Sequence, residues 1–231
     1  ILSRVGKPTC FVVTDIDEST DPPTAWLSRT IVQQKAQDRL LDSLRPGDVI
    51  PARVTHLEPF GAFVDAGCGV PSLIGIENLS VSRICHPSDR LTVGQSILAA
   101  VRTVEPENRR ISLTHRELLG TWAQNAALFS VGETVRGVVR SIEPYGVFIE
   151  LTPNLSGLAE PREDLRPGMA VSVYIKSILP QRMKVKPTII DVLAPYDAPT
   201  PPRYFITEGH IDEWTYTPVG CDKKPVKTVF E

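Results

Sequence analysis

A segment that occurs twice in the sequence sets the architecture of this chain. Residues 47–67, GDVIPARVTHLEPFGAFVDAG, align without a gap on residues 132–152, GETVRGVVRSIEPYGVFIELT. Both copies begin with Gly, continue with alternating apolar and polar residues, and reach a Glu-Pro pair that is followed by an aromatic residue and a second Gly. An internal repeat of this kind indicates two homologous structural units.

Each copy predicts a set of short strands. The first run alternates as a half-buried strand does, and Pro59 or Pro144 ends it. A second strand opens at the aromatic-Gly step, and three more follow: SLIGI, GQSILAAVRTV and RRISLT in the first copy, and SGLAE, GMAVSVYIKSI and RMKVK in the second. Five short strands in about 70 residues is the strand content of an OB-fold. We therefore expect an all-β fold of tandem five-stranded OB-fold barrels joined by short helices, at residues 45–117 and 131–191.

The segments before and between the copies predict helices. In residues 1–44, two strands around an acidic hairpin precede the helical sequence IVQQKAQDRLLDSL, and we interpret this part as a partial or degenerate N-terminal repeat. Residues 118–130 carry apolar residues at mixed three- and four-residue spacings, which predicts a helical linker packed on a barrel.

The last segment, residues 192–231, begins as a Pro-rich linker and continues as an aromatic-rich tail. Because the tail is too apolar for a free extension, we expect residues 203–217 to form a docked β-hairpin on the second barrel or its linker. The aromatic residues concerned are Tyr204, Phe205, Trp214 and Tyr216.

Composition argues against several functional classes. Four scattered cysteines and four histidines in different segments form no zinc motif, and the chain has no phosphate loop or nucleophile elbow. We therefore expect no enzyme activity, no cofactor, no metal and no small-molecule substrate. No apolar run approaches the roughly 18 residues of a membrane helix, and no secretory signal is recognisable, so we expect a cytoplasmic protein with no membrane partner.

The repeated aromatic–Gly–small–aromatic step suggests a stacking surface. A bulge or strong twist at the Gly could bring Phe60 and Phe63, or Tyr145 and Phe148, onto one side of a strand. Two aromatic rings on the outside of an OB barrel can stack on unpaired bases. The alternative is that these rings are core residues. Basic residues on or beside neighbouring strands could meet phosphates, and they include Arg53, Arg110, Arg182 and Lys184, although each could instead lie on a solvated strand face.

With these features the chain resembles the S1 RNA-binding domain family, the OB module that is repeated in the largest protein of the bacterial small ribosomal subunit. The resemblance is carried by LRPGDVIPARVTHLEPFGAFVDAG, RICHPSDRLTVGQ and VEPENRRISLT in the first copy, and it is weaker in the second. It implies an RNA-binding face made of Phe60, Phe63, Glu105 and Arg110, and of Tyr145, Phe148 and Arg182. The histidine expected after the third strand is Gly75 in one copy and Glu160 in the other.

Two functions follow as hypotheses. The resemblance implies a single-stranded RNA-binding protein that acts on mRNA or rRNA in translation, with the small ribosomal subunit as a further partner. The alternative is a protein–protein adaptor that docks on the ribosome or on an RNA-processing complex, with the aromatic patches as interface anchors. Basic and acidic residues nearly balance, 25 against 27, so the chain has no global positive field and any basic surface must be local.

Overall fold

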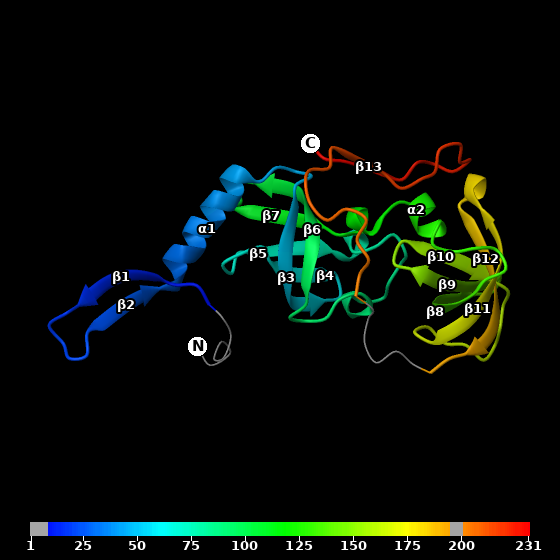
Figure 1. Ribbon diagram of the computed structural model, residues 1–231, viewed down its shortest axis with the longest axis horizontal. Coiled ribbons are helices and arrows are strands. Elements are labelled where there is room, and N and C mark those ends of the chain that lie inside the picture. The colour runs from blue at the N-terminus through cyan, green and yellow to red at the C-terminus, as the bar shows by residue number, and fades with distance from the viewer. Residues whose placement is uncertain (1–8, 195–200) are drawn as a thin grey trace.

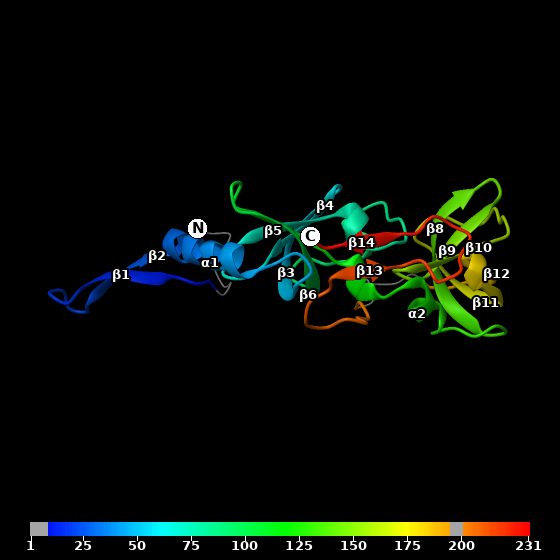
Figure 2. The same ribbon diagram turned by 90° about the horizontal axis from the view of Figure 1, so that it is seen from above.

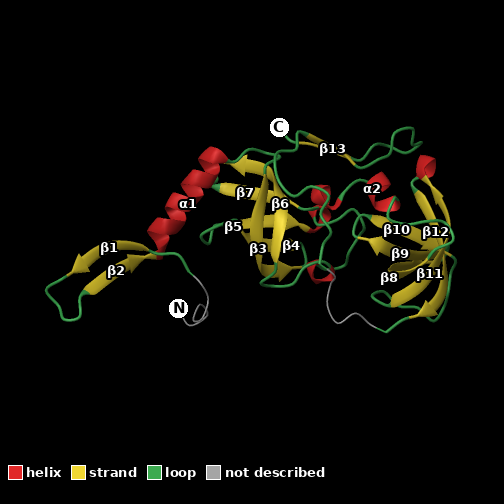
Figure 3. Ribbon diagram, viewed as in Figure 1, coloured by secondary structure: helices red, strands yellow, loops and turns green. Residues whose placement is uncertain are grey.

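The computed structural model describes residues 9–194 and 201–231. In Figure 1 a hairpin and a long helix lead into a first barrel, a second β-structure lies beyond it, and the C-terminal segment runs back across both. Figure 3 shows that strands dominate and that helices are few. Residues 1–8 of the predicted N-terminal repeat and residues 195–200 of the predicted Pro-rich linker lie outside the described residues.

The first copy of the repeat folds into a closed barrel. Its strands are β3 (Val49–Glu58), β4 (Gly61–Asp65), β5 (Pro71–Gly75), β6 (Ser96–Glu105) and β7 (Arg110–Thr114), in the order β3-β4-β5-β7-β6. A parallel pairing of β5 with β7 closes the barrel, with Leu73 opposite Ser112. Alternate residues point inward, and Val54, Val64 and Ile74 are among those that are fully buried. The predicted OB-type barrel is confirmed here.

The second copy has the same strand order but remains open along one seam. Its strands are β8 (Thr134–Glu143), β9 (Gly146–Thr152), β10 (Leu155–Ala159), β11 (Ala170–Leu179) and β12 (Lys184–Val192), in the order β10-β9-β8-β11-β12. No ladder joins β10 to β12 in the described residues, so the sheet is a curled half-barrel. We call it the second barrel below.

A proline, Pro187, lies at the open seam. Lys184 begins β12 as Arg110 begins β7. Pro187 and Leu113 each lie three residues further on, so they hold equivalent positions in the two barrels. Leu113 takes part in the pairing that closes the first barrel, whereas a proline has no N–H to donate to such a ladder. The seam is still packed, because a Cβ placed on Gly157 of β10 would lie 2.7 Å from Cδ of Pro187.

The N-terminal part forms a hairpin and a helix. Strands β1 (Val12–Asp17) and β2 (Thr24–Ser28) pair antiparallel, and α1 (Arg29–Ser43) follows. The Ser28 hydroxyl caps α1 by accepting a hydrogen bond from the N–H of Ile31 at 3.3 Å. Side chains of α1 reach the first barrel: Gln33 donates to the carbonyl of Gly69 at 2.8 Å. The predicted hairpin and helix are therefore both present, and the hairpin projects away from the barrel (Figure 1).

The linker between the barrels is two short helical turns. The 3-10 turn η4 (Arg116–Leu119) and the helix α2 (Trp122–Ala126) flank Gly120, whose φ is +84°. Leu118 and Trp122 are buried against residues of the second barrel. The short helices expected between the barrels are therefore present, with a break at the glycine.

The C-terminal tail differs from the prediction. Strand β13 (Glu213–Thr215) pairs antiparallel with β14 (Lys227–Val229), so the predicted C-terminal β-hairpin tail is present, but its predicted bounds, residues 203–217, are wrong. The backbone of residues 204–211 pairs with the first barrel and linker instead: Phe205 donates to the carbonyl of Leu118 at 2.8 Å, and Ile211 to that of Gly47 at 2.9 Å. These donors are thus unavailable for a local hairpin.

The tail also reaches the second barrel and so crosses both (Figure 2). The Tyr216 hydroxyl donates to the carbonyl of Asn154 at 2.5 Å, and the N–H of Asp222 donates to the carbonyl of Gln181 at 3.0 Å. Near the first barrel, His115 Nε2 lies 3.1 Å from the Tyr204 hydroxyl. We call residues 201–231 the strap, because they contact both barrels.

A buried asparagine joins the barrels directly. The side-chain oxygen of Asn154 accepts from the N–H of Val81 at 2.9 Å, and its amide donates to the carbonyls of Arg116 and Gly120, each at 2.8 Å. Asn154 is fully buried, so these bonds replace water completely.

A buried ion pair forms the second direct link. Arg90 of the first barrel makes a bidentate contact with Glu150 of the second, and the two side chains are 5% and 7% exposed. Arg140 binds the same carboxylate at 2.8 and 3.0 Å. Burial lowers the pKa of Arg90 from its ordinary value, and the Glu150 carboxylate opposes that shift. The loop that carries Arg90 is the longer connection of the first repeat, so this loop docks on the second barrel.

Candidate nucleic-acid interface

The first barrel carries its two predicted rings side by side on its outer surface. Phe60 lies in the turn between β3 and β4 and is 55% exposed, while Phe63 on β4 is half-buried. Their ring centroids are 6.0 Å apart, with the planes at 87°. Ala62 and Val64 on either side of Phe63 are fully buried, so Phe63 points outward. Phe60 is therefore not a core residue, and the two rings form one patch.

The glycine of the motif acts differently from the prediction. The irregularity in the β3–β4 ladder lies in β3, between Val54 and His56, and not at Gly61. A Cβ on Gly61 would lie 2.4 Å from the carbonyl oxygen of Ile74, which no side chain tolerates. Gly61 therefore permits the close approach of β4 to β5, and the turn that holds Phe60 brings it beside Phe63.

His56 adds a third ring that the sequence reasoning missed. It lies opposite Phe63 in the β3–β4 ladder, with ring centroids 6.4 Å apart and planes tilted by 32°. Its Nε2 lies 2.6 Å from the Glu58 carboxylate, which fixes the orientation of the imidazole. The missed signal was its register, because a residue opposite an outward ring shares that ring's face.

Two of the predicted basic residues flank the rings at one end of this face. A row of outward residues runs level across the barrel from Phe63 to Leu73 and then to Ser112. On β3, Arg53 lies opposite Asp65, which follows Phe63 by two residues on β4. On β7, Arg110 precedes Ser112 by two residues. Both are exposed, so the face offers aromatic rings beside two guanidinium groups.

The neighbours of Arg110 have different partners. Glu105 lies opposite Arg110 in the β6–β7 ladder and accepts from the side chain of Asn108 at 2.9 Å. Arg109 instead turns to α1, where it forms an ion pair of 2.7 Å with Asp38. Arg110 and Glu105 are therefore together at the predicted turn, whereas Arg109 is engaged with the helix.

The position at which the resemblance implies a histidine has a different side chain over it. A Cβ on Gly75 would lie 2.5 Å from a carboxylate oxygen of Glu77. Glu77 thus folds over Gly75 and places a negative charge near the end of β5. His56 supplies an imidazole on a different strand of the same barrel.

The second barrel repeats the ring pair. Tyr145 is 65% exposed, Phe148 is half-buried, and their centroids are 6.3 Å apart with planes at 87°. Ser141 lies opposite Phe148, where the first barrel has His56. This face therefore has two rings where the first has three.

The predicted basic residues of the second barrel lie close together at the β11–β12 turn. Lys184 pairs with Leu179 as Arg110 pairs with Glu105, so Lys184 holds the position of Arg110. Arg182 lies in the preceding 3-10 turn, η5 (Pro180–Arg182), and is exposed. No acidic residue stands at the place of Glu105.

Two acidic residues limit the second face. Glu160 is 87% exposed, and its carboxylate lies 3.7 Å from the amine of Lys176, a weak surface pair. Glu150 on β9 holds the position of Asp65 on β4. Arg90 of the first barrel covers the Glu150 carboxylate. One end of the second face is thus closed by the contact between the barrels.

Neither a metal site nor a membrane span is evident in the part of the chain that the structure describes. Within residues 9–194 and 201–231, no three His, Cys, Asp or Glu side chains gather as metal ligands. None of the helices in these residues has the length and apolar content to cross a bilayer.

Comparisons with known proteins agree with the geometry. Residues 43–116 match the family model described as the S1 RNA binding domain. Small ribosomal subunit protein bS1 of Staphylococcus epidermidis is 32% identical over 89% of this chain and 58% of its own length. The protein of the same name from Staphylococcus aureus (strain COL) is 32% identical over 74% of this chain and 48% of its own length. The chain spans about half the length of the curated relatives it matches.

Solved structures overlap with only part of the chain. The structure of GSP13 from Bacillus subtilis is 27% identical and covers 36% of this chain and 60% of its own, with a TM-score of 0.31. A complex of a/eIF2alpha, aDim2p and rRNA from Pyrococcus horikoshii is 24% identical and covers 37% of this chain and 51% of its own, with a TM-score of 0.32. The family match coincides with the closed barrel and its outward rings: residues 43–116 match the S1 RNA-binding domain family, within a chain that is similar to small ribosomal subunit protein bS1.

Proposed function

We propose that this chain binds single-stranded RNA through the outer faces of its two barrels. The observation that carries the proposal is the paired, outward rings of Phe60 and Phe63 on a barrel of the S1 family. Unpaired bases stack on such rings, and each stacked base contributes roughly 1–3 kcal/mol to binding. His56 is positioned to extend the stacking surface of the first barrel.

Phosphates would be bound by the basic residues at the edge of each ring face. In the first barrel these are Arg53 and Arg110, and in the second they are Arg182 and Lys184. Glu105 beside Arg110 is suited to accept hydrogen bonds from base or ribose groups, since a carboxylate is an acceptor only. The near-neutral charge of the chain implies that affinity comes from stacking and from linked sites rather than from a strong field.

The two barrels should contribute unequally. We infer that residues 45–117 and 131–191 are the two binding units and that the first is the stronger. The second has no ring at the place of His56, an exposed Glu160, and one end closed by Arg90 and Glu150. Because Asn154, the ion pair and the strap hold the barrels together, both faces should meet one RNA strand as a fixed pair.

The biological setting follows from the relatives. Their name assigns them to the small ribosomal subunit, and we propose that this chain also acts there, in the cytoplasm, on mRNA or rRNA. In this role it is a binding protein rather than an enzyme.

Salt dependence separates RNA binding from the adaptor alternative. If the four basic residues each neutralise one phosphate, the logarithm of affinity for a single-stranded oligonucleotide should fall with the logarithm of salt with a slope of about −3, at about −0.7 per phosphate. Fluorescence anisotropy with oligouridine at several salt concentrations measures this slope. A slope near zero, or no binding, would favour an adaptor whose rings anchor a protein.

A further inference from the structure

The strap carries a closed loop between its two strands. We call residues 218–225, which follow β13 and precede β14, the strap loop. At its base the N–H of Val226 donates to the Thr217 hydroxyl at 2.9 Å, and the N–H of Tyr216 donates to the carbonyl of Val226 at 2.9 Å. Within the loop the N–H of Cys221 donates to the carbonyl of Pro218 at 3.2 Å. These bonds give the strap loop a defined backbone.

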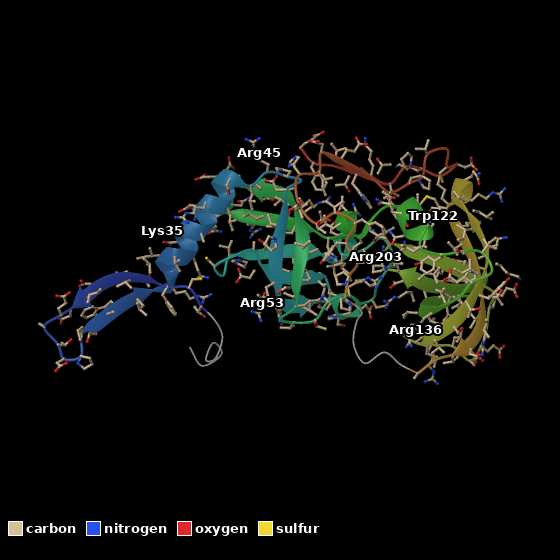
Figure 4. All side chains as sticks on the ribbon, in the orientation of Figure 1. Lys35, Arg45, Arg53, Trp122, Arg136 and Arg203 are labelled. Atoms are coloured by element: carbon tan, nitrogen blue, oxygen red, sulfur yellow. The ribbon has the colours of Figure 1, made fainter. Side chains whose placement is uncertain are left out.

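The strap loop lies on the β11–β12 turn of the second barrel. The N–H of Asp222 donates to the carbonyl of Gln181 at 3.0 Å. Lys223 and Arg182 are the next residues along each segment, so bond lengths alone limit the distance between their Cα atoms to about 15 Å. Figure 4 shows the strap loop beside this turn, at the opposite end of β11 from Arg136. Side chains of the strap loop and of the turn therefore share one small region of the surface.

Positive charge dominates this region. The turn, residues 180–184, contributes Arg182 and Lys184, and the strap loop contributes Lys223 and Lys224. All four side chains are exposed. Asp222 is the one acidic residue in the two segments, so four cations and one carboxylate give a formal charge of +3. The chain as a whole is nearly neutral, and this is therefore a local basic surface of the kind that RNA binding requires.

The four cations have no carboxylate partner among the described residues. Within residues 9–194 and 201–231, none of their side chains forms an ion pair or a side-chain hydrogen bond. The neighbouring lysine of the strap behaves differently, because Lys227 forms an ion pair of 2.8 Å with Glu213. An unpaired cation can neutralise a phosphate directly, whereas a paired one must first leave its carboxylate.

We propose that the strap loop binds RNA phosphates through Lys223 and Lys224, in one site with Arg182 and Lys184. The inference rests on the proposed function, in which Arg182 and Lys184 already bind phosphates at the second ring face. Phosphates recur along an RNA strand, so they suit cations that are spread over two adjacent segments. The strap is then part of the RNA-binding surface as well as a link between the barrels.

Fluorescence anisotropy of the whole chain with oligouridine tests this inference. At about −0.7 per phosphate, two further contacts should steepen the salt slope of RNA affinity from about −3 to about −4. The Lys223→Gln/Lys224→Gln variant should return the slope to about −3. Lys223→Arg/Lys224→Arg keeps both charges and should bind as wild type does. Lys227→Gln is the matched control, because Lys227 is an exposed strap lysine that pairs with Glu213, and it should leave the slope unchanged.

The same comparison in the Phe60→Ala/Phe63→Ala background assigns the lysines to the second barrel. There the glutamine changes should still reduce the slope by about 1.4, because the first face is weakened and the second is intact. A wild-type slope in Lys223→Gln/Lys224→Gln, an equal effect of Lys227→Gln, weakened binding in the arginine variant, or loss of the effect in the phenylalanine background would each overturn the inference. In these cases RNA binding by the wild-type chain would still support the proposed function. Absence of wild-type binding would overturn both.

Discussion

Removing the charge of Glu150 should destabilise the whole two-barrel unit. Glu150→Gln keeps the shape of the side chain but leaves the guanidinium of Arg90, which is 5% exposed, without its anion. Arg140 loses two contacts of 2.8 and 3.0 Å at the same time. Breaking a buried pair by neutralising one partner costs about 3–5 kcal/mol of unfolding free energy, because the other charge remains buried. At about 2–4 °C per kcal/mol for a chain of this size, the melting temperature should fall by roughly 6–20 °C.

The matched control is Glu160→Gln in the same barrel. Glu160 is 87% exposed and lies 3.7 Å from Lys176, so its loss should change the free energy of unfolding by at most about 0.5 kcal/mol. Calorimetry and urea unfolding of both variants provide the comparison. If Glu150→Gln proved as mild as Glu160→Gln, the ion pair would not be the buried link between the barrels that the geometry indicates.

Three further predictions concern the strap and the first face. Burial lowers the pKa of His115 to about 4, so between pH 6.5 and 4 only the unfolded chain binds a proton at this histidine. The free energy of unfolding should therefore fall by roughly 3 kcal/mol as the pH falls through that window. A His115→Gln variant with the same dependence of stability on pH would contradict this. Gly47→Ala should loosen the strap, because the new Cβ would lie 2.2 Å from the carbonyl oxygen of Ile211. The control is Gly168→Ala, where φ is similar and no atom lies within 4 Å, so this change should cost only backbone strain of roughly 1 kcal/mol. Equal protease sensitivity of the strap in both variants would refute the contact. Arg110→Ala should reduce the salt slope of RNA binding by about 0.7, while Arg109→Ala, whose side chain pairs with Asp38, should not; anisotropy titrations that show equal effects would argue against the assigned roles.

The repeat in the sequence was sufficient to predict the barrels. Strand positions follow from alternating apolar residues, and these residues fill the interiors that the structure shows, as with Val54 and Val139. The outward position of Phe60 and Tyr145 could also be predicted from the sequence, because both residues follow a strand-ending proline. What local sequence could not reveal was the role of Gly61, which depends on the carbonyl of Ile74 on the neighbouring strand.

Long-range pairing accounts for the remaining differences. The predicted bounds of the C-terminal hairpin were wrong because residues 204–211 hydrogen-bond to the first barrel and linker, and nothing in their own sequence indicates that partner. The second barrel has Pro187 where the first barrel has Leu113, a difference that becomes visible only when the registers of β12 and β7 are compared. The docking of Arg90 on Glu150 joins residues 60 positions apart and has no periodic signal.

Affinity measurements on ring variants test whether the outward rings of the first barrel bind unpaired bases. The affinity of oligouridine should be compared among wild-type protein, Phe60→Ala, Phe60→Leu and Val93→Ala. Loss of a stacking ring should weaken binding by roughly 1–3 kcal/mol, or about 5- to 150-fold, in both Phe60 variants, because leucine keeps apolar bulk but cannot stack. Val93 is an exposed apolar residue that is neither one of the rings nor one of the basic residues assigned to the face, and its variant should bind as wild type does. The melting temperatures should remain nearly equal, since Phe60 is 55% exposed. Unchanged RNA affinity in both Phe60 variants would contradict the account.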